Sequence, residues 1–139
     1  MKDVVSQAVK DNREGIADLQ DVLKGMDQLA LEPVHRFSEG LYARELTLPA
    51  GSVVVGKIHK HAHLNVIMKG RCTVTTPFGS DELEGPMIFE SKPDTKRAVY
   101  AHTDTVWITF HPTEETDVDV IEEQIISKDY SDNLLEDKS

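Results

Sequence analysis

The chain has a single cysteine, Cys72, among its 139 residues, which excludes an intramolecular disulfide. Cys72 lies in an apolar run from Arg71 to Thr76, and this position predicts a buried and inert thiol. Catalysis by Cys72 would need a neighbour that favours the thiolate. The sequence also has no Ser/His/Asp motif, no nucleotide-binding glycine loop and no CxxC pair, so hydrolase and nucleotide chemistry through those devices have no support.

Long apolar runs and basic residues are scarce as well. No apolar stretch reaches the roughly 18 residues of a membrane span. The first residues, MKDVVSQAVKDNREG, contain no apolar signal core, so we expect a cytoplasmic protein without a membrane partner. Fifteen Lys and Arg residues oppose 25 Asp and Glu residues, which gives a net charge of −10. No basic face is visible, and nucleic-acid binding is therefore not expected.

The acidic charge is concentrated at one end of the chain. From Glu114 to Ser139, ten acidic residues are opposed only by Lys128 and Lys138. A solvated tail that aids solubility is favoured over a segment that docks on a basic partner. A short acidic helix is expected at the start of this region, because Thr116 and Asp119 have the spacing of a capping box. Its apolar stripe consists of Val118, Ile121 and Ile125.

A length of 139 residues fits a single domain. An apolar stripe near the start of the chain has helical spacing and predicts an N-terminal helix; its residues are Ile16, Leu19, Leu23 and Met26. The predicted organisation is a helical arm at 1–30, a β-barrel at 31–113, and an acidic helix with a tail at 114–139.

From about Val34 the apolar period changes to two, which indicates β-strands. Short turns separate the candidates, so the connections are too short for parallel crossovers. The pattern predicts an antiparallel all-β sandwich or barrel. The predicted strands are Val34–Phe37, Leu41–Leu48, Ser52–His61, Leu64–Met68, Arg71–Thr76, Ser80–Leu83, Met87–Glu90, Arg97–Ala101 and Thr105–His111.

Three of the six histidines, His59, His61 and His63, lie within the run GKIHKHAHLN. Side chains two apart on a strand point to the same face, so these rings are expected to converge. Neutral imidazoles are common ligands of first-row metals, and three of them can hold Zn, Fe, Ni, Cu or Mn with coordination positions left open. The alternative is a polar, hydrogen-bonded rim of the barrel without metal.

The strands and the histidine cluster together resemble the cupin family, whose fold is a small jelly-roll barrel. His59 and His61 match the HxH of the first cupin motif, and Gly70 matches its closing glycine. His63 stands at the place of the motif's glutamate, with a shorter loop before it. Gly51 is the nearest candidate for the opening glycine and lies two residues early. The resemblance implies an all-β, single-domain, cupin-like jelly-roll barrel.

The second cupin motif is only partly present. Pro93 matches its proline, but Thr95 stands at the glycine and Ala98 at the metal-binding histidine. The resemblance therefore lacks its usual fourth ligand. His102, at the motif's asparagine, or His111 from a neighbouring strand is a candidate for that role.

Phrases such as RFSEGLYARELTLPAG and KRAVYAHTDTVWITFHPTEETD, with GKIHKHAHLN, also resemble small single-domain cupins from tailed-phage genomes. This resemblance implies a phage-encoded protein located in the host cytoplasm or the virion. Cupins commonly assemble by packing their sheets, so a homodimer or larger homo-oligomer is expected. The resemblance implies no established activity.

Four other side chains are candidate ligand contacts. Lys57 and Asn65 share the parity of the histidines; Lys57 either pairs with a carboxylate such as Glu90 or extends to the surface, and Asn65 could orient a metal ligand. Arg44 beside Tyr42 could bind a carboxylate or phosphate, although pairing with Glu45 or Glu82 at the surface is favoured.

Lys96 and Arg97 are adjacent bases near the second motif. They either meet an anionic ligand at the barrel mouth or pair with the acidic C-terminal helix.

Two functions follow as hypotheses. The first is a metal-binding accessory or binding protein without an assignable reaction, which the incomplete second motif favours. The second is a small metal-dependent enzyme, of dioxygenase or isomerase type, acting on a small polar substrate in the barrel. No general acid or base can be named from the sequence.

Overall fold

The computed structural model describes residues 31–56 and 58–127. Their elements, in chain order, are β1 (Val34–Ser38), β2 (Leu41–Leu48), β3 (Val53–Val55), β4 (Ile58–His59), β5 (His63–Lys69), β6 (Arg71–Thr76), β7 (Gly79–Glu84), β8 (Met87–Ser91), β9 (Ala98–Ala101), β10 (Thr105–Pro112), α2 (Val118–Ile125) and β11 (Ile126–Ser127). The all-β prediction for the body of the chain is confirmed. The predicted N-terminal helix lies outside the described residues.

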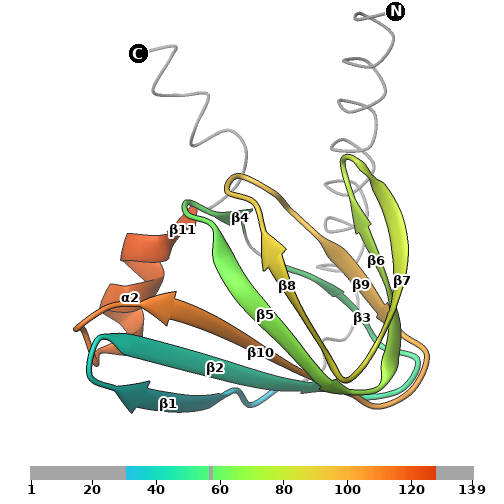
Figure 1. The fold of residues 1–139 in the computed structure, drawn as a ribbon, viewed down its shortest axis with the longest axis horizontal. Coiled ribbons are helices and arrows are strands. Elements are labelled where there is room, and N and C mark those ends of the chain that lie inside the picture. Colours follow the sequence, from blue (N-terminus) through green and yellow to red (C-terminus); the bar gives the residue numbers. More distant parts are fainter. Residues whose placement is uncertain (1–30, 57, 128–139) are drawn as a thin grey trace, which may run out of the picture.

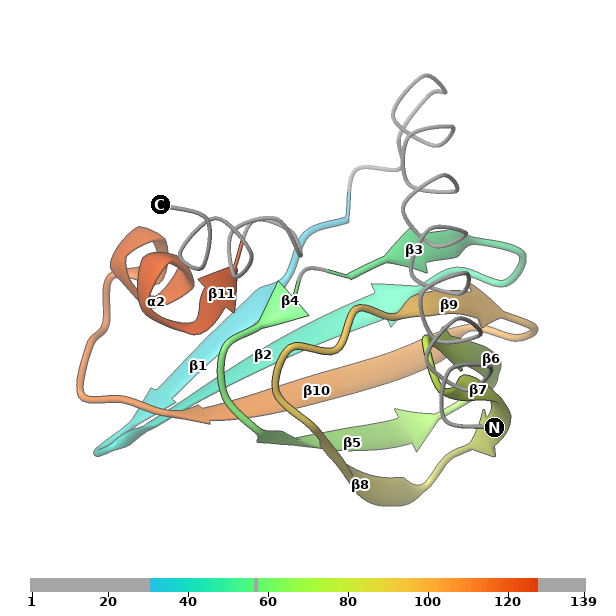
Figure 2. The same ribbon diagram turned by 90° about the horizontal axis from the view of Figure 1, so that it is seen from above.

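Two antiparallel sheets form the body. One has the order β1-β2-β10-β5-β8 and the other β3-β9-β6-β7, while β4 pairs with β11 in a small third sheet. Figures 1 and 2 show α2 and β11 together at the opposite end of the molecule from the β6–β7 hairpin. Several neighbouring strands in the sheets are far apart in sequence, as β2 and β10 are, which is typical of a jelly roll.

Most predicted strands agree with the structure to within a residue or two, but the continuous strand predicted at Ser52–His61 is wrong in its middle. β3 pairs with β9, whereas β4 pairs with β11. Between them the Gly56 amide donates to the Arg97 carbonyl at 2.9 Å. The chain therefore leaves one sheet and joins another. The alternation of side chains between two faces is interrupted at this change of pairing partner.

The main core lies between the two larger sheets. Its buried members are Leu48, Ile67, Cys72, Val74, Val99, Ala101 and Trp107. Cys72 is fully buried and free, so its predicted burial is confirmed, and burial raises the pKa of its thiol.

Helix α2 forms where the capping pattern predicts it, but one residue later. Asp117, rather than Thr116, is the N-cap, and its carboxylate accepts from the amides of Asp119 and Val120. Ile121 and Ile125 are buried against Tyr42 in a second, smaller core. Within 31–56 and 58–127, no helix has the length and apolar character needed to cross a membrane.

The turn between β5 and β6 depends on Gly70. Its φ is +101°, a conformation that residues with a Cβ rarely adopt. A Cβ added there would lie 2.6 Å from the Cα of Thr105, so backbone approaches this turn closely. Gly70 is the residue that matches the closing glycine of the first cupin motif.

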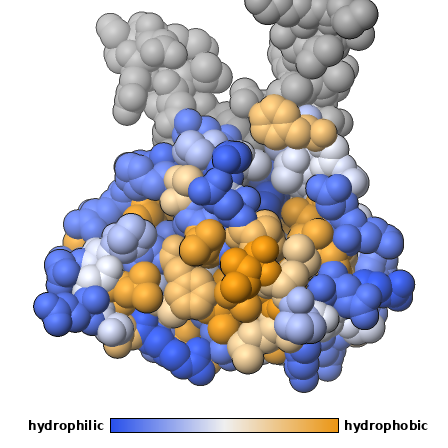
Figure 3. Space-filling view, in the orientation of Figure 1, coloured by the Kyte–Doolittle hydropathy of each residue, from blue (hydrophilic) through white to orange (hydrophobic). Residues whose placement is uncertain are grey.

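The outer face of the five-stranded sheet is apolar. Leu64, Met68 and Ile88 are between 51% and 68% exposed on it. The strand register places Val66 between Ile108 and Ile88, which gives an apolar row across β10, β5 and β8. Leu64 lies beside Phe110 in a second row, which ends at Glu90 on β8. Figure 3 shows the resulting apolar patch, hereafter the sheet face.

Candidate functional site

Three imidazoles from three different strands come together inside the barrel. They belong to His59 on β4, His63 at the start of β5 and His111 near the end of β10. The ring centroids lie 4.3 Å apart for His59 and His63, 4.8 Å for His63 and His111, and 5.1 Å for His59 and His111. The structure thus brings two of the three predicted strand histidines together with His111.

His61 lies elsewhere because the chain bends between β4 and β5. Lys60 and His61 form this bend and are exposed, and strand geometry resumes only at His63. The alternation that predicted three rings on one face therefore holds for His59 and His63 but not for His61. The backbone of His61 contacts the cluster, where its carbonyl oxygen accepts from Nδ1 of His63 at 3.5 Å.

The hydrogen bond to His61 fixes which nitrogen of His63 carries the proton. A carbonyl oxygen can only accept, so Nδ1 is the protonated atom and Nε2 keeps its lone pair. Nε2 is buried and has no hydrogen-bond partner among the described residues. A buried lone pair without a partner is costly, and it invites a ligand.

Burial keeps all three imidazoles neutral near neutral pH. It lowers the pKa of His59 to about 2, with His63 and His111 adding to the effect. It also lowers the pKa of His63 and of His111 to about 4, with Arg97 and Arg44 among the charged neighbours. Neutral imidazole is the form that binds a metal.

The three rings are not oriented as a finished ligand set. In the part of the chain that the structure describes, no group of three or more His, Cys, Asp or Glu side chains is arranged to hold a metal ion. The ring planes are tilted by 42° between His59 and His63 and by 39° between His63 and His111, while His59 and His111 are nearly parallel. Their nitrogens would converge only after the rings turn.

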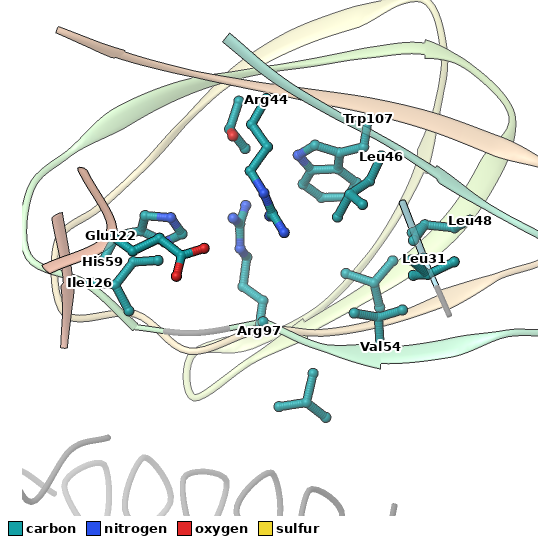
Figure 4. A pocket seen from close by; sticks show the side chains of 14 residues that line it. Leu31, Arg44, Leu46, Leu48, Val54, His59, Arg97, Trp107, Glu122 and Ile126 are labelled. Carbon is teal, nitrogen blue, oxygen red and sulfur yellow. The ribbon is translucent and has the colours of Figure 1, made fainter. Parts of the chain in front are cut away.

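A cavity of about 260 Å³ opens beside His59 and extends between the two sheets. In Figure 4, His59, Glu122 and Ile126 lie at one side of it, and Trp107, Leu46, Leu48 and Val54 at the other. The barrel is therefore hollow next to the histidines rather than filled by side chains. A space of this size suits a small molecule.

Two arginines reach into this cavity from opposite sheets. Arg44 comes from β2 and Arg97 from the residue before β9, and their side chains extend toward each other (Figure 4). The surface pairing favoured for Arg44 is wrong. Glu45 instead pairs with Arg36 at 2.8 Å, and Glu82 lies 3.9 Å from His102.

Neutral groups hold Arg97 in place. Its Nη1 donates to Oγ of Ser91 at 2.6 Å and to Oδ1 of Asn65 at 3.5 Å, and its guanidinium carbon lies 5.1 Å from the centroid of the Trp107 ring. Asn65 is fully buried, accepts from Nε1 of Trp107 at 2.9 Å and donates to Ser91 at 2.8 Å. Asn65 thus supports an arginine, and its side chain also contacts the side chain of His63. That Asn65 orients a metal ligand stays a prediction.

The remaining predicted contacts lie apart from the cavity or cannot be placed. Tyr42 is buried, hydrogen-bonds His35 at 2.6 Å and stacks beside His111, but it does not line the cavity. His102 bonds Thr73 at 2.7 Å. It therefore sits with the four-stranded sheet. Lys57 lies outside the described residues.

Glu90, suggested as the partner of Lys57, is exposed and pairs with Lys92 at 2.7 Å.

Sequence reasoning did not identify Glu122 and Trp107 as cavity residues. Trp107 belongs to the core and also forms a cavity wall. Glu122 follows the buried Ile121 on α2 and looks like one more acidic residue of a solvated helix. Glu122 lines the cavity because α2 packs over the barrel, and the sequence does not show this packing.

No family model matches the chain, and no curated protein matches it. Solved structures do resemble it. Ectoine synthase from P. lautus aligns with a TM-score of 0.57 at 12% identity, over 73% of this chain and 78% of that one. A cupin superfamily protein from Desulfitobacterium hafniense aligns with a TM-score of 0.52 at 10% identity, over 63% and 81%. A cupin domain from Bordetella pertussis aligns with a TM-score of 0.50 at 19% identity, over 64% and 99%. At these identities the likeness establishes the fold alone.

Proposed function

We propose that this cupin-fold chain is a metal-binding protein that takes up a small molecule in the cavity beside the metal. His59, His63 and His111 would hold the metal. The observation that carries the proposal is the meeting of three neutral imidazoles around the buried, unpartnered Nε2 of His63.

The spacing of the rings fits a shared metal. Imidazole nitrogens bind a transition metal at about 2.1 Å, which places the centroids of three such rings about 4.5–5.3 Å apart. The observed separations run from 4.3 to 5.1 Å. The proposal requires the rings to turn so that their nitrogens converge. Three imidazoles favour Zn, Cu, Fe or Ni over metals that prefer oxygen ligands.

The experiment is a metal titration of the full chain, purified without a histidine tag and stripped with a chelator. Zn²⁺ added during isothermal titration calorimetry should bind at one site per chain. His59→Ala and His111→Ala should weaken binding at least about tenfold, because each removes a ligand. The matched control is His61→Ala, which removes an exposed neighbouring imidazole and should leave the affinity within about twofold.

Two results would contradict the proposal: absence of stoichiometric Zn²⁺ binding by the wild-type chain, or an equal loss in His61→Ala. Circular dichroism of each variant separates lost ligation from lost folding.

A metal-dependent enzyme is the second candidate. The hollow cavity favours it, because His59 and the carboxylate of Glu122 both line the space where a substrate would lie. Such a metal would act on a bound oxygen-bearing molecule as a Lewis acid. Turnover that requires both the metal and Glu122 would favour the enzyme over the binding protein.

We also propose that the chain forms a homodimer through the sheet face. Leu64, Met68 and Ile88 are exposed side by side there, and monomers rarely present such continuous apolar surface to water. The packing of sheets that the cupin resemblance implies gives a second copy as the occupant. The phage origin stays a prediction from the sequence alone.

A further inference from the structure

The cavity contains two positive charges, those of Arg44 and Arg97, and no carboxylate in the part of the chain that the structure describes lies within ion-pair distance of either. The groups that hold Arg97 are the hydroxyl of Ser91, the amide of Asn65 and the Trp107 ring, all of them neutral. Two like charges directed into one small space repel each other, and an anion between them would relieve this repulsion.

Arg97 is also fixed in position before any ligand arrives. Ser91 and Asn65 hold Nη1, and Asn65 is itself held by Trp107. Little side-chain entropy remains to be lost when an anion binds to the rest of this guanidinium. The planar fork of a guanidinium matches the two oxygens of a carboxylate.

The walls of the cavity indicate the chemical character of the part of the ligand that does not contact the arginines. Beyond the arginines, the space is bounded mainly by apolar side chains, namely Leu46, Leu48, Val54, Val99 and Trp107. A free phosphate would leave these walls without contacts, whereas an organic acid would place its carbon chain against them. His59 lies at the other side of the cavity, within reach of a molecule that fills it.

We propose that the ligand is a small organic acid, whose carboxylate is bound between Arg44 and Arg97 and whose apolar body packs against the wall formed by Leu46, Leu48 and Val54. This inference rests on the proposed function for the role of the metal, but the arginine site stands without it. Glu122 brings a carboxylate to the other side of the same cavity.

The test uses the full-length chain and the fluorescence of Trp107, its only tryptophan, which lines the cavity. Straight-chain acids from acetate to hexanoate are titrated beside hexanamide and inorganic phosphate. The acids should cause a saturable change in fluorescence, and their affinity should rise with chain length. Hexanamide should bind at least about tenfold more weakly than hexanoate.

Variants assign the effect to the arginines. Arg44→Gln and Arg97→Gln should each weaken hexanoate binding at least about tenfold. Arg36→Gln is the control, because it removes a surface guanidinium that is 56% exposed and paired with Glu45, and it should change nothing. If Arg97→Gln does not fold, Arg44→Gln and Arg44→Lys decide the outcome.

Titrations with a chelator and with Zn²⁺ separate this inference from the proposed function. Acid binding that survives the chelator supports the arginine site even if Zn²⁺ never binds. Stoichiometric Zn²⁺ binding without any response to the acids overturns the inference and leaves the metal site intact. Equal binding of phosphate and hexanoate, or of hexanamide and hexanoate, also overturns it.

Discussion

At the scale of single residues, the site depends on histidines whose pKa values burial lowers below the value in water. The unfolded chain protonates its histidines near the ordinary pKa of 6.5, whereas burial lowers the pKa of His63 and His111 to about 4. As the pH falls below 6.5, the unfolded state therefore takes up protons before the folded state does. The contribution of these two neutral imidazoles to the free energy of unfolding is complete above about pH 6.5 and is lost progressively toward pH 4.

We expect this loss to be measurable in chelator-treated protein. Urea unfolding at pH 7 and at pH 5 should show a fall in the free energy of unfolding, of which a single imidazole such as His111 accounts for about 1–2 kcal/mol. His111→Asn should show a smaller fall than the wild type. His61→Asn, at an exposed position, should show the same fall as the wild type. A pH dependence identical in all three proteins would refute the assignment.

A second residue-scale prediction concerns Gly70. Gly70 and Gly51 both have positive φ, but a Cβ meets open space at Gly51 and the backbone of Thr105 at Gly70. Gly51→Ala should cost about 1–2 kcal/mol of unfolding free energy, which is the price of the left-handed conformation. Gly70→Ala should cost at least about 1 kcal/mol more, because the backbone must also move. Equal costs in chemical denaturation would contradict the close approach.

The histidines also show what sequence spacing can predict. His59 and His63 were placed correctly because each lies on a strand with one buried face. His61 lies on the bend between those strands, and nothing in its own neighbours marks that bend. The role of Arg44 was misjudged because a charged side chain within a strand is usually assigned to solvent, whereas this one faces a cavity that both sheets must assemble.

At the scale of elements, strand bounds were predictable wherever turn residues separate apolar alternation, as at Leu41–Leu48 and Arg71–Thr76. The break between β3 and β4 was not, because it reflects a change of pairing partner rather than a local breaker. The position of α2 on the barrel could not be predicted either. Its apolar stripe predicts that the helix packs against something, but it does not identify the surface.

Helix α2 gives a prediction at this scale. Asp117 caps it by accepting from the Asp119 amide at 3.0 Å, and the helix carries Ile121 and Ile125 into the smaller core. Asp117→Ala should lower the free energy of unfolding by about 1 kcal/mol. Asp117→Asn keeps an acceptor oxygen and should retain most of the stability. Thermal or urea unfolding checks both, and an equal loss in the two variants would show that the cap is not the cause.

At the scale of the whole molecule, the sheet face should decide the oligomeric state. Ile88→Glu puts a charge at the β8 end of an apolar row, at the most exposed side chain of the sheet face, and should convert a dimer into a monomer at micromolar concentration. Phe78→Glu is the matched control, because Phe78 is 73% exposed at the β6–β7 turn, away from the sheet face. Sedimentation velocity distinguishes the states. A monomeric wild type, or dissociation by Phe78→Glu alone, would refute this interface.

The pairing of β4 with β11 has a consequence for biosynthesis. His59 lies on a two-residue strand, and the register places it opposite Ile126, near the last of the described residues. Until that region has been synthesised, β4 lacks its pairing strand, although both larger sheets can already close. The nascent chain would therefore acquire its barrel first and its complete trio of imidazoles only after β11 has been made.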